Sequence, residues 1–140
     1  MHAGQVSFPG GMPKKSEKIR TAALRETFEE VGIEPSAVRI IGTLSTLYIP
    51  ASAFALHPVV GISDVRPEIY PATAEVERAI EVPLEELANP ANLYRGTRWR
   101  HDRTYDVPYF ELSNERVWGA TSMVLAELLV VLGLGPTNPW

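Results

Sequence analysis

The sequence contains no cysteine, and this absence excludes disulfide bonds, thiolate metal sites and cysteine nucleophiles. A basic segment followed by an apolar run is also missing from its first residues, so no secretory signal is recognisable there. The longest apolar stretch, MVLAELLVVLGLG, is too short to span a membrane and contains Glu127. We therefore expect a cytoplasmic protein that has no membrane partner.

Excess positive charge is missing as well. The net charge is −4 and the isoelectric point is about 5.4, which argues against a nucleic-acid-binding surface but leaves room for a local basic pocket. The chain has 140 residues, of which 45% are hydrophobic and 21% are charged. This length and composition predict a single domain over residues 1–140 with a real hydrophobic core.

The pattern of apolar and turn residues predicts both helices and strands. A helix is expected from about residue 17 to residue 31, with Ser16 as its N-cap and Gly32 just past its end. The remaining expected elements are strands at 5–8, within 38–49, at 54–62, at 76–84 and on both sides of a turn at 113–114, a short helix at 83–90 and a last helix from 120 to 133. This order predicts an α+β fold, arranged as α/β/α layers with a mixed sheet.

The first expected helix carries an unusual concentration of acidic residues. Its apolar positions form one stripe, made by Leu24, Phe28 and Val31. At about 100° per residue, Glu26, Glu29 and Glu30 lie on the opposite side, within roughly a 100° arc. Arg25 precedes Glu29 by four residues and is placed to brace that carboxylate. The helix is therefore expected to pack on one side and to carry a carboxylate cluster on the other.

Two interpretations of this cluster compete. It could be an ordinary solvated acidic face, or it could bind a hard divalent cation. Carboxylate oxygens without cysteine or a nearby histidine suit Mg²⁺ or Mn²⁺ better than Zn²⁺. Two like charges 4 Å apart repel by about 1 kcal/mol in water but by about 4 kcal/mol at an effective dielectric constant of 20. A sheltered carboxylate trio is therefore costly unless a cation offsets the repulsion.

The spacing of the fixed positions decides between these interpretations. Gly11 is followed by five residues, Glu17, seven residues, Arg25-Glu26, two residues, Glu29-Glu30, one residue and Gly32-Ile33. With this spacing the chain resembles the Nudix hydrolases, because it matches every fixed position of the Nudix box. One softer position departs, since Thr27 stands where the box prefers a bulky apolar residue.

The resemblance implies roles for individual residues. It implies Glu29 and Glu30 as principal metal ligands, and Glu26 as a further ligand or as the base that activates water. The turn Pro9-Gly10-Gly11 bends the backbone tightly and can aim a carbonyl group of Gly11 at the metal. Structural roles fall to Glu17, Arg25 and Gly32. Glu17 is expected to contact the loop or to orient Arg25, and Gly32 is expected to close the helix.

The resemblance also implies the reaction, which is hydrolysis of a diphosphate linked to a nucleoside. Such a pyrophosphohydrolase acts on acid anhydrides, uses Mg²⁺ or Mn²⁺ to neutralise charge on the phosphoryl oxygens, and needs no covalent nucleophile. Many family members use an additional acid from outside the box. Glu75 is the candidate here, with Glu77 as its competitor and a plain surface role as the other possibility.

Segments outside the box indicate a branch of the family. HAGQVSFPGG, HPVVG, EVPL, VPYF and VWGATSMVLAELL resemble the coenzyme A (CoA) diphosphatases. This implies cleavage of CoA or acyl-CoA to 3′,5′-ADP and 4′-phosphopantetheine or its acyl form. The alternatives are an ADP-ribose or dinucleotide diphosphatase, or a catalytically silent Nudix-fold module that binds nucleotides.

Two further expectations concern the substrate and the partner. Relatives carry an upstream strand and the first half of the extra motif, so the fold is expected to be N-terminally incomplete, with an exposed sheet edge that a second copy of the chain could cover in a homodimer. Candidate substrate-binding residues are Lys14, Lys15, Arg98 and Arg100. Each could meet a substrate phosphate, and each could equally be a solvated surface residue.

Overall fold

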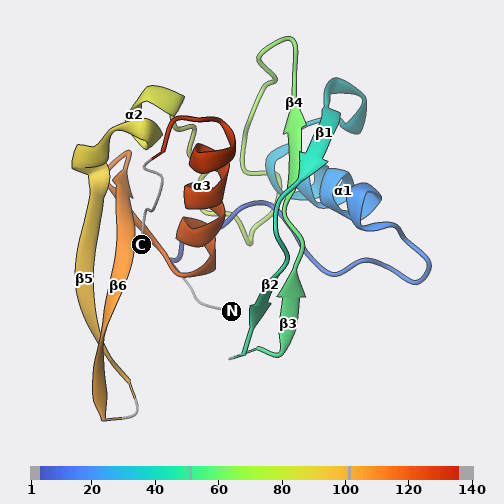
Figure 1. Cartoon of the computed structure of the whole chain (residues 1–140). Helices are drawn as coiled ribbons and strands as arrows, with labels where there is room; N and C mark the ends of the chain where they lie inside the picture. The colour runs from blue at the N-terminus through green and yellow to red at the C-terminus, as the bar shows by residue number, and fades with distance from the viewer. Residues whose placement is uncertain (1–3, 51, 101, 136–140) are drawn as a thin grey trace. The chain divides into compact units, whose positions relative to one another are not determined.

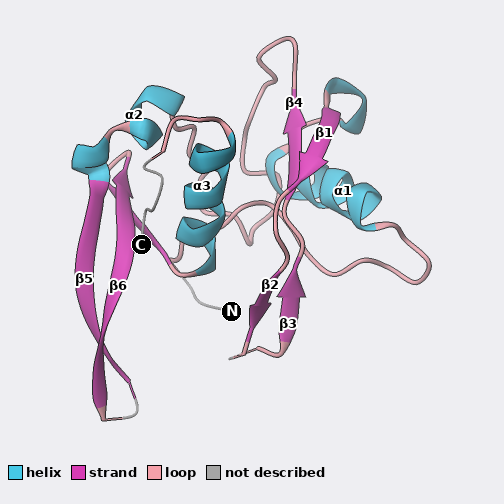
Figure 2. Cartoon of the chain, viewed as in Figure 1, coloured by secondary structure: helices cyan, strands magenta, loops and turns pink. Residues whose placement is uncertain are grey.

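The computed structural model describes residues 4–50, 52–100 and 102–135, apart from the side chain of Arg100. The chain divides into two compact units (Figures 1 and 2). One unit spans Phe8–Ile80, and the other combines Met1–Ser7 with Glu81–Trp140. A single domain over residues 1–140 stays a prediction.

The Phe8–Ile80 unit contains one long helix and two small sheets (Figure 2). Its elements are α1 (Ile19–Val31), a 3₁₀ helix (Pro35–Ala37), β1 (Arg39–Thr43), β2 (Leu47–Ile49), β3 (Phe54–Leu56) and β4 (Val59–Ile62). β1 pairs with β4 and β2 pairs with β3, both antiparallel. The β1–β4 register shifts between Ile40 and Gly42, which marks a bulge or irregularity.

The other unit contains a three-stranded sheet and two α-helices. Its elements are α2 (Leu84–Ala88), a 3₁₀ helix (Pro90–Asn92), β5 (Leu93–Arg100), β6 (Arg103–Leu112), β7 (Glu115–Trp118) and α3 (Ala120–Val131). The strands are antiparallel in the order β5-β6-β7. Its core is formed by Leu87, Phe110, Leu112, Val117, Ala126 and Leu129. Alternate residues of β6 enter this core, as expected of a sheet with one covered face.

The two ends of α1 test the capping predictions. Gly32 has the left-handed conformation (φ 77°) and its N–H donates to the carbonyl of Phe28, which confirms it as the end of the helix. Ser16 is not the N-cap. That position belongs to Lys18, whose side chain makes no capping hydrogen bond, while Ser16 has a positive φ of 65° in the loop before it. The helix therefore begins two residues later than expected.

The α+β class is confirmed, and several details differ from the expectation. All strand pairs among the described residues are antiparallel, in three small sheets rather than one mixed sheet. Residues 5–8 and 76–84 form no strand, although their sequences alternate. Alternation of apolar and polar residues predicts that a segment has one apolar face, but it does not supply a neighbouring strand. A β-strand needs such a neighbour for its backbone hydrogen bonds. Within the described ranges, no helix combines the length and the apolar character that crossing a bilayer requires.

Candidate active site

The glycine turn before α1 lies directly against two of the acidic side chains. A Cβ atom at Gly11 would stand 2.6 Å from both Cδ and Oε1 of Glu26. The backbone N–H of Gly10 donates a hydrogen bond to the carboxylate of Glu30. Neither glycine has a positive φ, so the turn needs glycine at position 11 for space rather than for an unusual backbone conformation.

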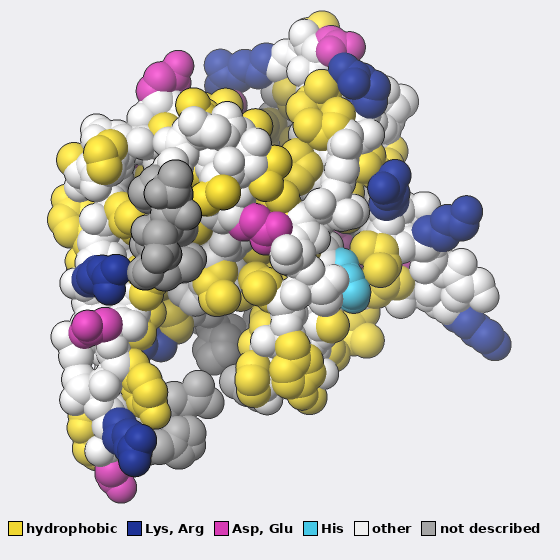
Figure 3. All heavy atoms as spheres, viewed as in Figure 1, with side chains coloured by type: hydrophobic (Ala, Val, Ile, Leu, Met, Phe, Trp, Pro, Cys, Tyr) yellow, Lys and Arg dark blue, Asp and Glu magenta, His cyan; other side chains and the backbone are white. Residues whose placement is uncertain are grey.

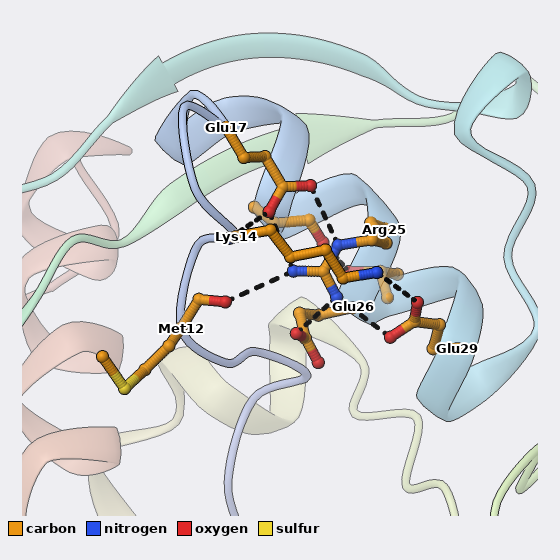
Figure 4. A network of polar contacts seen from close by, with 8 residues as sticks. Met12, Lys14, Glu17, Arg25, Glu26 and Glu29 are labelled. Atoms are coloured by element: carbon orange, nitrogen blue, oxygen red, sulfur yellow. Dashed lines mark hydrogen bonds and ion pairs between the residues drawn. The ribbon is translucent and has the colours of Figure 1, made fainter.

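Arg25 is the hub of the polar network beside this turn (Figure 4). Its Nε and Nη2 atoms lie 2.9 Å from the two carboxylate oxygens of Glu17, which is a bidentate ion pair. Its Nη1 atom contacts Glu26 Oε1 at 2.6 Å and Glu29 Oε2 at 3.0 Å. Nη2 also donates to the carbonyl of Met12 at 3.3 Å. The predicted contact between Arg25 and Glu29 is confirmed, and one guanidinium group links the loop to the acidic side of the helix.

Glu17 fastens the loop to Arg25, as the sequence led us to expect. One of its carboxylate oxygens accepts the backbone N–H of Lys14 at 2.8 Å. The hydrogen bonds from Arg25 and from that N–H lower the pKa of Glu17 from 4.5 to about 2. The same ion pairs raise the pKa of Arg25 above its ordinary value, with the bond to Glu17 as the largest cause. Both groups therefore stay charged across the physiological range of pH.

Glu30 has a different environment from Glu17. Burial raises the pKa of its carboxyl group, and the negative charges of Glu26, Glu75 and Glu29 raise it further. The hydrogen bond from Gly10 acts in the opposite direction. Because several like charges act on Glu30, an additional cation at this place would relieve the repulsion.

Exposure along α1 does not follow the expected division into an apolar and a solvated side. The side chain of Glu26 is 16% exposed, whereas Phe28 of the expected apolar stripe is 40% exposed. Val31 is buried as expected, and Glu29 is 44% exposed. The acidic cluster is therefore not a plain solvated face, because the loop covers Glu26 while Glu29 remains open to solvent.

The donor atoms present fit a hard divalent cation in type. They are carboxylate oxygens beside a close-fitting glycine turn, the ligand chemistry that Mg²⁺ and Mn²⁺ prefer. Over residues 4–50, 52–100 and 102–135, however, no three acidic or histidine side chains gather closely enough to hold an ion as they stand. One oxygen each of Glu26 and Glu29 is engaged by Arg25.

Glu75 comes to this site from the loop after β4. Its charge acts on Glu30, and the loop that carries it is hydrogen-bonded to the end of α1. Sequence reasoning missed three contributors: the N–H of Gly10, the carbonyl of Met12 and the side chain of Tyr70, whose ring lies against Gly32. No spacing rule indicates these contacts, since two are made by backbone atoms and the third joins segments far apart in the sequence.

The four candidate substrate-binding residues are divided between the two units. Lys14 and Lys15 are exposed in the loop before α1, where Figure 3 shows Lys and Arg side chains projecting at the right of the view. The Nζ atom of Lys14 lies 3.9 Å from Glu29 Oε1. In the other unit, the guanidinium of Arg98 stacks 3.5 Å from the centre of the Trp118 ring. The side chain of Arg100 lies outside the described part of the chain.

Comparisons with known proteins point to one family. A family model described as the NUDIX domain matches residues 1–107. An uncharacterised Nudix hydrolase named NudL from Pectobacterium atrosepticum is 34% identical over 136 residues, covering 96% of this chain and 70% of that protein. The NudL protein of Citrobacter koseri is 36% identical over 142 residues with the same coverage. Nudix hydrolase 3 of Caenorhabditis elegans is 33% identical over 150 residues, covering 94% of this chain and 61% of that protein.

Proposed function

The chain belongs to the Nudix hydrolase family, a family of pyrophosphohydrolases, and on this premise we propose that it hydrolyses CoA or acyl-CoA with the help of Mg²⁺ or Mn²⁺. The family implies a small nucleotide-like substrate, and its members generally use divalent metals. The observation that carries the proposal is the approach of the Gly10-Gly11 turn to Glu26 and Glu30. An acidic surface that is merely solvated would not need a glycine turn packed this closely against its carboxylates.

In this proposal Glu26, Glu29 and Glu30 would hold the cation, with the backbone of Gly11 and the carboxylate of Glu75 as further ligands. When bound, it would neutralise the charge that builds on the phosphoryl oxygens. A carboxylate of the site accepts a proton from the attacking water. The water oxygen forms a bond to phosphorus, and the bridging P–O bond of the diphosphate breaks. One CoA and one water thus give 3′,5′-ADP and 4′-phosphopantetheine.

The surrounding residues have supporting tasks. Arg25 and Glu17 hold the loop and the carboxylates together through the ion pairs described above. Lys14 would meet a phosphate oxygen of the substrate, which is supported by the exposure of its ammonium group and by its closeness to Glu29. Lys15 shares the same loop. For Arg98 and Arg100, contact with the substrate stays a prediction, as do the homodimer and the cytoplasmic location.

The choice of CoA rests on sequence resemblance outside the box. HAGQVSFPGG ends in the glycine turn, and HPVVG, EVPL, VPYF and VWGATSMVLAELL further along the chain also resemble the CoA diphosphatases. The turn itself takes part in the site, since Gly10 and Gly11 contact two carboxylates. Gly11 is a fixed position of the box, so these contacts support the metal site, and the choice of CoA rests on the segments outside the box.

A substrate panel tests the proposal. CoA, acetyl-CoA, ADP-ribose and diadenosine polyphosphates are each incubated with the protein and Mg²⁺ or Mn²⁺, and the products are separated by chromatography. We expect 3′,5′-ADP from CoA and acetyl-CoA at higher kcat/KM than any product from the other compounds. A preference for ADP-ribose or a dinucleotide would replace the CoA assignment. Metal binding without turnover of any compound would favour the silent nucleotide-binding module.

A further inference from the structure

The C-terminal end of α1 is completed by a segment far along the chain. The last carbonyl groups of a helix have no partner within it. Here the carbonyl of Phe28 accepts the N–H of Gly32 at 3.0 Å, that of Val31 accepts the N–H of Tyr70 at 3.2 Å, and that of Glu30 accepts the N–H of Ala72 at 2.9 Å. The loop after β4 therefore returns to α1 and binds its end (Figure 1).

The side chain of Tyr70 adds a second contact at the same place. A Cβ atom at Gly32 would stand 2.5 Å from Cζ, 2.6 Å from Cε1 and 2.9 Å from the hydroxyl oxygen of Tyr70. The phenol ring therefore lies against the bare backbone of Gly32, and only glycine leaves room for it. Tyr70 is 47% exposed, so the ring is shielded on the side of Gly32 and partly open elsewhere.

These contacts determine where the following residues lie. Residues 63–83 form neither helix nor strand, so their position depends on individual contacts of this kind. Glu75 comes only three residues after Ala72, whose N–H is bonded to the backbone of Glu30. Thr73 and Val76 close a turn around it, since the N–H of Val76 donates to the carbonyl of Thr73 at 3.2 Å. The charge of Glu75 accordingly acts on the carboxylate of Glu30.

We propose that Tyr70 is a positioning residue of the active site: its ring, seated on Gly32, holds the loop that carries Glu75 against the end of α1. This inference rests on the proposed metal-dependent function. It gives Gly32 a second role beyond ending the helix, because the same bare backbone that permits the left-handed turn also seats the ring. A residue that merely stabilised α1 would affect unfolding without affecting the affinity of the site for a cation.

The test measures the dissociation constant of Mn²⁺ alone, from the electron paramagnetic resonance signal of the free ion, on the full chain. The variants are Tyr70→Ala, Tyr70→Phe, Glu75→Gln and the double variant Tyr70→Ala with Glu75→Gln. Glu77→Gln is the matched control, because it removes the same charge two residues further along the loop. Circular dichroism melts accompany each variant, and Tyr70→Leu replaces Tyr70→Ala if the latter does not fold.

We expect Glu75→Gln and Tyr70→Ala each to weaken Mn²⁺ binding by about tenfold, the range seen when groups that orient metal ligands are removed. Tyr70→Phe, which keeps the ring, and Glu77→Gln should bind like the wild type. The double variant should bind no more weakly than Glu75→Gln alone, because Tyr70 acts through Glu75.

Other outcomes separate the two proposals. Unchanged Mn²⁺ affinity of folded Tyr70→Ala beside a weakened Glu75→Gln would overturn the role of Tyr70 while leaving the metal site intact. Additive losses in the double variant, or a normal affinity of Glu75→Gln, would also overturn it. A wild-type protein that binds no Mn²⁺ would instead overturn the proposed metal-dependent function, and this inference with it.

Discussion

Gly11 and Gly32 come before and after the acidic helix in the sequence, and the same residue type meets a different requirement at each position. Gly11 has no positive φ, and what it provides is space for the carboxylate of Glu26. Gly32 has a φ of 77° and also receives the ring of Tyr70. A clash at Gly11 would involve the tip of a flexible side chain, whereas a substitution at Gly32 would also strain the backbone. The glycine before the helix is therefore adapted to the site, and the glycine after it to the fold and the site together.

The largest effects are expected from the carboxylates between these two glycines. Glu29→Gln and Glu30→Gln should each lower kcat by about 100-fold or more, because each removes a charge needed for the reaction. Both variants should stay folded. Glu111→Gln is the matched control. Glu111 lies in the other unit, is 46% exposed and is ion-paired with Arg116 of that same unit. Steady-state kinetics on the best substrate of the panel measures the effect. Unfolding of either variant would contradict the geometry of α1.

Added metal should stabilise the folded protein. A ligand that binds only the folded state at 100 times its dissociation constant adds about 2.7 kcal/mol to the free energy of unfolding. We therefore expect millimolar Mg²⁺ to raise Tm in a thermal melt, and to raise it less in Glu30→Gln. Identical melting curves with Mg²⁺ and with the chelator EDTA would count against a metal site on α1.

Gly32→Ala should destabilise the protein by roughly 1–2 kcal/mol, the usual cost of a left-handed conformation for a residue with a Cβ. Displacement of the Tyr70 ring adds to this cost. Gly10→Ala is the control, because it has no positive φ and a Cβ there would meet no atom within 4 Å. Urea unfolding measures the free energy of unfolding of both variants. Equal stability of Gly32→Ala and the wild type would contradict the claim that position 32 requires glycine for its left-handed conformation.

Gly11→Ala should show the opposite pattern. The new Cβ would displace the carboxylate of Glu26, which lies 2.6 Å away, so turnover should fall on the order of tenfold. The free energy of unfolding should stay close to that of the wild type, because the end of a long side chain can move at little cost. If stability fell and turnover did not, the comparison between the two glycines would be reversed.

The smallest expected effect concerns Glu17 and pH. The pKa of Glu17 is lowered in the folded protein from 4.5 to about 2, so its ion pair with Arg25 stabilises the fold above pH 4.5. That contribution is lost as the pH falls from 4.5 towards 2. Glu17→Gln should therefore be less stable than the wild type at pH 7, and the difference should shrink over this window. Urea unfolding at several pH values measures it, and a constant difference would contradict the pKa shift.

Much of the site followed from local spacing. Arg25 and Glu29 are four residues apart on one helix, so their contact is nearly independent of the rest of the fold. Gly32 as the end of the helix followed from the preference of glycine for the left-handed conformation. The start of α1 was less predictable. Ser16 is a good capping residue, but the loop that Glu17 ties to Arg25 places the N-cap at Lys18 instead.

Strands without a local partner were predicted poorly. The turn at Ser113-Asn114 sets the β6–β7 hairpin directly, and the structure confirms it. Residues 5–8 alternate equally well, yet Val6 packs against the core of its unit and accepts a hydrogen bond from Thr121 rather than joining a sheet. Alternation reports which side chains are apolar, whereas strand formation requires a second backbone at the right distance.

The sequence by itself determined the family, the acidic helix and the identity of the groups that could hold a cation, because these depend on residue types at fixed spacing along one helix. Only the tertiary structure decided that Gly11 makes room for Glu26, that Gly10 donates to Glu30 and that Tyr70 rests on Gly32. These contacts join a loop to a helix, or residues nearly 40 positions apart, and they arise from backbone approach that no local pattern encodes.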